Sequence, residues 1–133
     1  MNQISEGDHK QLAIWAADCA ESVLPQFESQ YTDDRPRKAI EAVRAWTRGE
    51  RTVSEVRKLA FAAHAAARSG NSVQAKSAAR AAGHAAATAH VPRHAKYAAV
   101  YAVKADRERQ LVHLPEHLVQ LLDIPDIVKS CML

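Results

Sequence analysis

The stretch from Leu59 to Ala105 is built largely from alanine, and this constrains the fold more than any other feature of the chain. Alanine loses no rotamer entropy on entering a helix and is the best helix former. Its methyl side chain also lets two helices approach to the short end of the usual axis separation of about 8–10 Å. We therefore expect closely packed helices here, with a few histidines set among small residues.

The length and composition of the whole chain fit one all-α domain. The chain has 133 residues, enough for a domain that buries about two-thirds of its unfolded surface. It contains only 4 glycines and 5 prolines, which is too few for an all-β fold with many turns. The sequence predicts an all-α, single-domain bundle of about five to seven helices over residues 1–133, with an alanine-rich core.

Apolar periodicity and capping residues indicate where the helices lie. Ser5 and Asp34 are predicted to cap the first two helices, and Thr52 with Glu55 has the spacing of a capping box. Pro92 can open the fifth helix. The helices are predicted over residues 6–24, 35–48, 53–69, 72–90 and 92–109.

The composition changes after Gln110, where large aliphatic residues replace alanine. Two prolines, Pro115 and Pro125, divide this Leu-rich segment, residues 111–133. It can cover the alanine helices, or it can form a contact between two copies of the chain in a homodimer. We favour the first interpretation.

The sequence shows no membrane or secretion signal. The segment Met1–Glu6 is polar, and Arg68, Lys76 and Arg80 interrupt the alanine region before about 18 apolar residues accumulate. The chain has 2 cysteines, and they show no disulfide pattern. We expect a reduced, cytoplasmic protein.

Seven histidines make a metal site one hypothesis. Zinc needs three or four converging ligands, and Pro92 breaks the helix that would align His90 with His94. We expect no metal, and histidines that form hydrogen bonds between helices or face solvent. A buried, neutral His64 or His84 would have a pKa below the ordinary value near 6.5.

The chain also lacks the patterns of common catalytic sites. Its serines and cysteines fall at helix caps, on helix surfaces or in the tail, and it has no glycine-rich phosphate loop. We therefore expect neither enzyme activity nor a cofactor. The net charge of +3 is well below that of a dedicated nucleic-acid binder.

Two groups of residues are candidates for contact with a partner. One is a polar-aromatic ridge formed by His94, Tyr97 and Tyr101, which have i, i+3, i+7 spacing. This ridge could bind a ligand or fill a gap between helices. The other is the charged segment 33–38, whose arginines oppose the helix dipole that its aspartates favour. That segment is either a recognition surface or a paired surface network. The candidate partner-binding residues are Asp33, Asp34, Arg35, Arg37, His64, His84, His94, Tyr97 and Tyr101.

Three parts of the sequence resemble a known family. They are residues 33–42, followed by Trp46, Gly49 and Glu50, the alanine run around His64, and residues 82–91. Together they resemble the bacterial immunity proteins related to immunity family five of polymorphic toxin systems, over residues 12–104. The resemblance implies a small cytoplasmic helical protein that binds and neutralises a cognate toxin. It carries over no catalytic or toxin-contacting residues.

Two other functions remain open. One is a histidine-based metal- or ligand-binding protein that uses His64, His84, His90 and His94. The other is a small nucleic-acid-associated or regulatory module, which the modest charge disfavours. Its basic face would consist of Arg35, Arg37, Lys38, Arg44, Arg48 and Arg51.

Overall fold

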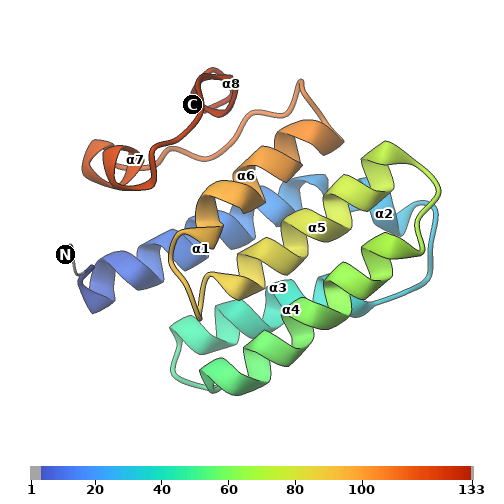
Figure 1. Cartoon of the computed structure of the whole chain (residues 1–133), viewed down its shortest axis with the longest axis horizontal. Helices are drawn as coiled ribbons and strands as arrows, with labels where there is room; N and C mark the ends of the chain where they lie inside the picture. The colour runs from blue at the N-terminus through green and yellow to red at the C-terminus, as the bar shows by residue number, and fades with distance from the viewer. Residues whose placement is uncertain (1–3, 133) are drawn as a thin grey trace.

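Helices account for nearly all the regular structure of the computed structural model, which describes residues 4–132 (Figure 1). The all-α prediction is confirmed. Six helices of seven residues or more are accompanied by two single turns, α2 and α8. The elements are α1 (Glu6–Val23), α2 (Pro25–Glu28), α3 (Arg35–Thr47), α4 (Val53–Arg68), α5 (Val73–Ala87), α6 (His94–Ala105), α7 (Glu116–Leu122) and α8 (Asp126–Lys129).

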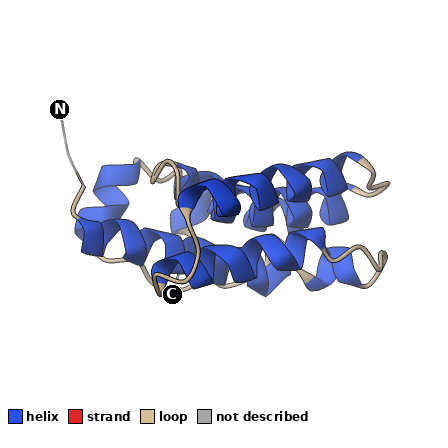
Figure 2. Cartoon of the chain, turned by 90° about the horizontal axis from the view of Figure 1, so that it is seen from below, coloured by secondary structure: helices blue, strands red, loops and turns tan. Residues whose placement is uncertain are grey.

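The five long helices form two layers, and α5 lies in the middle of one of them. Helices α4, α5 and α6 lie side by side in one layer, and α1 and α3 lie in the other (Figures 1 and 2). Helix α5 packs against all four of its long neighbours, so it is the central element. This arrangement places the outer faces of α4, α5 and α6 next to one another on one surface.

Buried alanine methyl groups join the two layers, as the sequence predicted. Ala78, Ala79 and Ala82 on α5 and Ala98 and Ala99 on α6 are completely buried. Each buried methyl group contributes only about 0.8 kcal/mol, so stability depends on many such close contacts.

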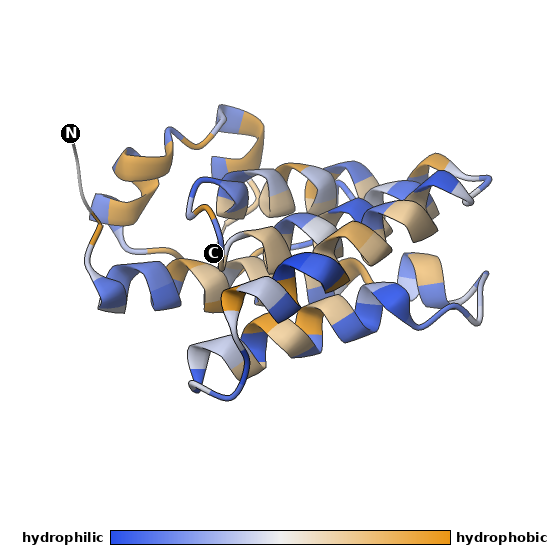
Figure 3. Ribbon diagram, turned by 60° about the horizontal axis from the view of Figure 1, so that its bottom comes forward, coloured by the Kyte–Doolittle hydropathy of each residue, from blue (hydrophilic) through white to orange (hydrophobic). Residues whose placement is uncertain are grey.

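Larger side chains close the remaining sides of the core. Buried leucines of the C-terminal segment, Leu111, Leu114 and Leu118, belong to the same core as the alanines. The Trp15 indole N–H donates a 2.8 Å hydrogen bond to the carbonyl of Val112, which ties this segment to α1. Figure 3 shows strongly hydrophobic residues in this segment and paler alanine-rich helices. The segment therefore covers the protein's own core.

The helix starts agree with the predicted caps at two of three positions, Ser5 and Thr52, and Ser72 adds a cap that was not predicted. Ser5 and Ser72 accept backbone N–H groups, and Thr52 and Glu55 form the predicted capping box. The prediction for Asp34 was wrong in detail. Asp34 occupies the N-cap position but makes no capping hydrogen bond, because its backbone is not extended and its carboxylate pairs with Lys38 at 3.2 Å.

Helix α6 is shorter at both ends than the predicted 92–109. It begins only at His94, after a turn that contains Pro92. It ends at Ala105, because Asp106 adopts an extended backbone and its carboxylate accepts the N–H of Glu108 at 3.0 Å. No helix among residues 4–132 is long and apolar enough to span a bilayer.

Candidate functional site

Positive charge is concentrated in the layer formed by α4, α5 and α6. Residues 53–105 contain eight lysines and arginines but only one carboxylate, Glu55. The rest of the chain has ten lysines and arginines and fourteen carboxylates. The layer therefore has a formal charge of +7 and the remainder has −4, which the overall +3 conceals.

These eight cations also differ from most of the others in having no carboxylate partner among residues 4–132. Outside the layer, eight of the ten lysines and arginines lie within 4.0 Å of a carboxylate. Within residues 53–105, all of which the structure describes, none does, and Glu55 itself pairs with Arg51. The unpaired side chains are Arg57, Lys58, Arg68, Lys76, Arg80, Arg93, Lys96 and Lys104.

Helical spacing gathers most of these cations and several aromatic rings on one surface. Residues three and four apart share a helix face, and each of the three helices presents one such stripe outward. We call this surface the basic aromatic face. Its stripes are Arg57, Phe61, His64 and Arg68 on α4; Lys76, Arg80 and His84 on α5; and His94, Tyr97, Tyr101 and Lys104 on α6.

A group of rings, the His/Tyr cluster, lies at the centre of this face around His84. The ring of His84 is 4.8 Å from that of His64 and 5.2 Å from that of His94, measured between centroids. Tyr101 lies nearly parallel to His84, at 5.2 Å and 8°, and Tyr97 lies 5.5 Å from it. The cluster therefore consists of His64, His84, His94, Tyr97 and Tyr101, five of the nine predicted partner-binding residues.

Gly83 makes room for the part of the cluster contributed by α4. A Cβ atom at this position would lie 2.7 Å from ring atoms of His64. Only glycine therefore lets the His64 ring rest on α5 in its observed position. The spacing of residues along the sequence does not indicate this role of Gly83.

The contact between Arg80 and His64 requires a neutral His64 imidazole. Arg80 lies with its Nη1 atom 3.4 Å from Nδ1 of His64. Since arginine can only donate, Nδ1 of His64 is the acceptor and cannot carry a proton. Burial also favours the neutral form of the neighbouring His84. It lowers the pKa of His84 to about 3, and the electrostatic interaction with His64 lowers that pKa further. Burial also lowers the pKa of His64, assisted by the charge of Arg80, and the pKa of His94.

Three cations lie over aromatic rings around this cluster. Arg57 is 5.6 Å from the centroid of Phe61, Lys96 is 5.3 Å from that of Tyr97, and Lys104 is 4.8 Å from that of Tyr101. Phe61 is 60% exposed and Tyr97 is 39% exposed. The face thus combines accessible aromatic area with positive charge, and aromatic and arginine side chains are both enriched at protein interfaces.

Residues 2–121 of the chain match the family model described as "Imm-5 like putative immunity protein". The chain belongs to this family. The matched region is wider than the stretch 12–104 on which the resemblance rested, and it includes α7 apart from its last residue. Neither the curated proteins nor the solved structures contain a match.

The other predicted site residues of this Imm-5-like protein lie in a separate, ion-paired segment. Arg35 makes a bidentate bond to Asp33, with a shortest distance of 2.6 Å, and this bond lowers the pKa of Asp33. Arg37 binds Glu28 of α2 in the same way, at 2.6 and 2.7 Å. Among residues 4–132, no hydrogen bond or ion pair joins this segment to the His/Tyr cluster.

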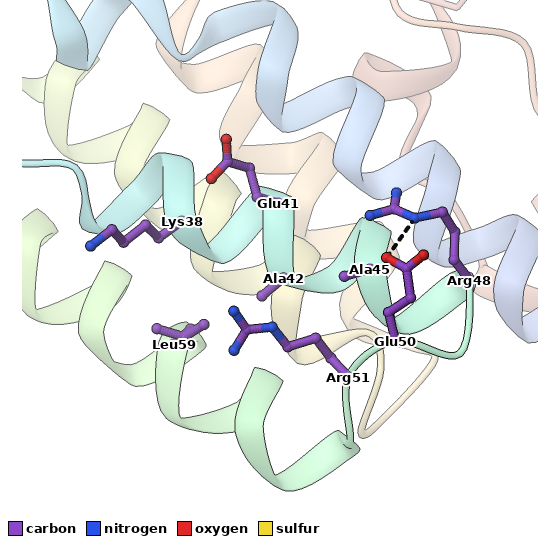
Figure 4. Close-up of a pocket in the computed structure, with 8 residues that line it drawn as sticks. All are labelled: Lys38, Glu41, Ala42, Ala45, Arg48, Glu50, Arg51 and Leu59. Carbon is purple, nitrogen blue, oxygen red and sulfur yellow. Dashed lines mark hydrogen bonds and ion pairs between the residues drawn. The ribbon is translucent and has the colours of Figure 1, made fainter.

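The basic face proposed for a nucleic-acid module is likewise paired in this Imm-5-like protein. Arg44 bridges Asp18 and Glu21 of α1, and Arg51 pairs with Glu55. Figure 4 shows an open hollow between α3 and α4, in which Arg48 donates to Glu50 at 3.0 Å. All six cations of that hypothesis have a carboxylate neighbour, so they do not form an unpaired basic surface.

The histidines of the metal hypothesis are only partly brought together. His64, His84 and His94 meet in the cluster, whereas His90 is exposed beyond the end of α5. Nδ1 of His84 and Nδ1 of His94 are 3.0 Å apart and form a hydrogen bond with each other. In the part of the chain that the structure describes, no group of three or more His, Cys, Asp or Glu residues is placed to hold a metal ion.

Proposed function

We propose that this protein binds and neutralises a cognate bacterial toxin as a stoichiometric, non-catalytic inhibitor. The observation that carries this proposal is the match to the immunity-protein family over residues 2–121, nearly the whole chain. The long helices are joined by a close-packed alanine core. A rigid body loses little conformational entropy on binding, and this favours tight association.

The chemistry of the His/Tyr cluster supports binding rather than catalysis. A histidine that acts as general acid or base works best with a pKa near the operating pH, whereas burial lowers the pKa of His64, His84 and His94. The imidazoles contact one another, two tyrosines and Arg80, none of which is a carboxylate that could orient a catalytic histidine.

Co-expression tests the proposal directly. Bacteria that produce the toxin encoded beside this gene should survive only when this protein is also made. Purified toxin should lose its activity linearly as the protein is added, with complete inhibition at equimolar amounts. Survival without the protein would overturn the proposal. Inactivation of excess toxin by a small fraction of an equivalent would reveal turnover and overturn the non-catalytic part.

A further inference from the structure

We infer that the basic aromatic face is the toxin-binding surface, and that it binds an acidic patch on the toxin. This inference rests on the proposed function and adds to it the surface used and the chemistry of the partner. The first observation is the segregation of charge. Arg80, Lys104 and the other cations of the face have no carboxylate partner among residues 4–132, although most cations elsewhere in the chain do.

Arg80 is the group best placed to bind a carboxylate of the partner. It is half-buried at the centre of the face, and its one observed hydrogen bond is the 3.4 Å contact between Nη1 and His64. A guanidinium has five N–H donors in a planar fork that matches both oxygens of a carboxylate. Arg80 therefore retains donors for a bidentate bond, and His64 limits the orientations that its side chain can adopt.

Phe61 and Tyr97 supply the apolar area that an interface needs beside its charges. Both rings are substantially exposed, and each has a cation within 6 Å of its centroid. Aromatic side chains of this kind carry much of the binding energy at protein interfaces. Because the three histidines of the cluster are neutral, lysines and arginines carry the whole positive charge of the face at neutral pH.

The distribution of charge favours a protein partner over a nucleic acid. A nucleic acid is a continuous polyanion, and any strand longer than the face would meet the remainder of the molecule, which has a formal charge of −4. An acidic patch on a protein can instead be confined to the area of the basic aromatic face. Attraction between the acidic patch of the toxin and the basic aromatic face also accelerates their association, so the association rate constant should be higher at low salt.

Matched substitutions test the surface. We would measure the Kd of the neighbouring-gene toxin for the full-length protein and for Arg80→Gln, Phe61→Ala and Lys104→Gln. The control is Arg48→Gln, which removes the same charge from an exposed, ion-paired position. We expect Arg80→Gln and Phe61→Ala to weaken binding at least about tenfold. Lys104→Gln should weaken it about threefold with a smaller salt dependence, and Arg48→Gln should change it less than about twofold.

Circular dichroism and the thermal midpoint identify any variant that fails to fold. If Arg80→Gln fails to fold, the inference is tested by Lys104→Gln and Phe61→Ala, which change exposed residues. Wild-type affinity in all folded face variants would overturn the inference and leave the proposed function intact. If the unmodified protein does not bind the toxin, the proposed function fails instead. Binding of a fluorescent 20-nucleotide DNA or RNA at 150 mM salt, lost in Arg80→Gln, would overturn the inference in favour of a nucleic-acid partner.

Discussion

Nδ1 of His84 and Nδ1 of His94 lie 3.0 Å apart and form a hydrogen bond between α5 and α6. Such a bond needs one nitrogen with a proton and one without, so the two imidazoles cannot both be cationic. The contact between Arg80 and His64 imposes a similar condition between α4 and α5. The outer contacts of this helix layer are therefore sensitive to protonation.

The first prediction concerns the dependence of stability on pH. The pKa values of His64, His84 and His94 are lowered in the folded state, so folding favours their neutral forms. Their contribution to the free energy of unfolding is therefore fully present above about pH 6.5, the ordinary pKa of histidine. It is lost as the pH falls toward the lower pKa values of the folded state. Arg68 and Arg80 face His64 and add to the penalty for its protonation. Between pH 7.5 and 5.5 we expect a loss of about 1 kcal/mol, or about 4 °C in the thermal midpoint.

His84→Asn provides the control for this prediction. The amide can replace one hydrogen bond of Nδ1 but does not titrate. The variant should be about 1 kcal/mol less stable at pH 7.5 because it loses ring contacts with Tyr101. Its midpoint should change less between pH 7.5 and 5.5 than that of the wild type. An equally steep change in the variant would show that His84 is not a source of the pH dependence.

The second prediction concerns Gly83→Ala, which would place a methyl group where the His64 ring lies. The ring must move toward solvent, and the cost is partly offset by the gain of about 1 kcal/mol in helix propensity. We expect a net destabilisation of about 1 kcal/mol. NMR titration should show the pKa of His64 rising toward its ordinary value. Gly7→Ala is the matched control, because it meets no atom within 4 Å and should leave stability unchanged or slightly higher.

The third prediction tests how tightly the alanine core is packed. Ala82 is completely buried on α5, so Ala82→Leu adds three carbons to the interior between the helices. We expect urea denaturation to show a loss of about 3 kcal/mol. Ala62→Leu makes the same change at a half-buried position on α4 and should alter stability by less than about 0.5 kcal/mol. Equal effects at the two sites would mean that the core is loosely packed.

The fourth prediction concerns the attachment of the C-terminal segment. Trp15→Phe removes the indole N–H that binds the Val112 carbonyl and should cost about 1–2 kcal/mol. The loss should be local: the amide of Leu111, bonded to the carbonyl of Cys131 at 2.6 Å, should exchange faster with deuterium. Amides in the middle of α5 should be less affected. Uniformly faster exchange along the whole chain would contradict a local role.

The sequence predicted the parts of this structure that depend on local interactions. The capping box of Thr52 and Glu55 and the buried faces of α5 and α6 follow from residue type and helical spacing alone. The ridge of His94, Tyr97 and Tyr101 was predicted from the same periodicity. The end of α6 was not, because the turn at Asp106 depends on its side chain competing with the helix.

The contacts that complete the candidate site join different helices, and the sequence could not provide them. Arg80 and Gly83 both contact His64, and they do so only because α4 lies beside α5. The sequence left open whether the segment 33–38 is a recognition surface or an ion-paired network, because the partner of Arg37 is Glu28, nine residues earlier on a different helix. One signal was available: counting carboxylates by region would have revealed the charge of residues 53–105.

The alanine packing of α4, α5 and α6 separates the positions that can vary in evolution from those that cannot. Inward positions such as Ala79 and Ala98 have no exposed surface, and protein interiors are packed so closely that a larger residue there is disfavoured. Outward positions such as Phe61 and Lys104 are exposed. Descendants of this chain can therefore acquire new binding specificities by exchanging surface side chains, while the same helical scaffold is inherited unchanged.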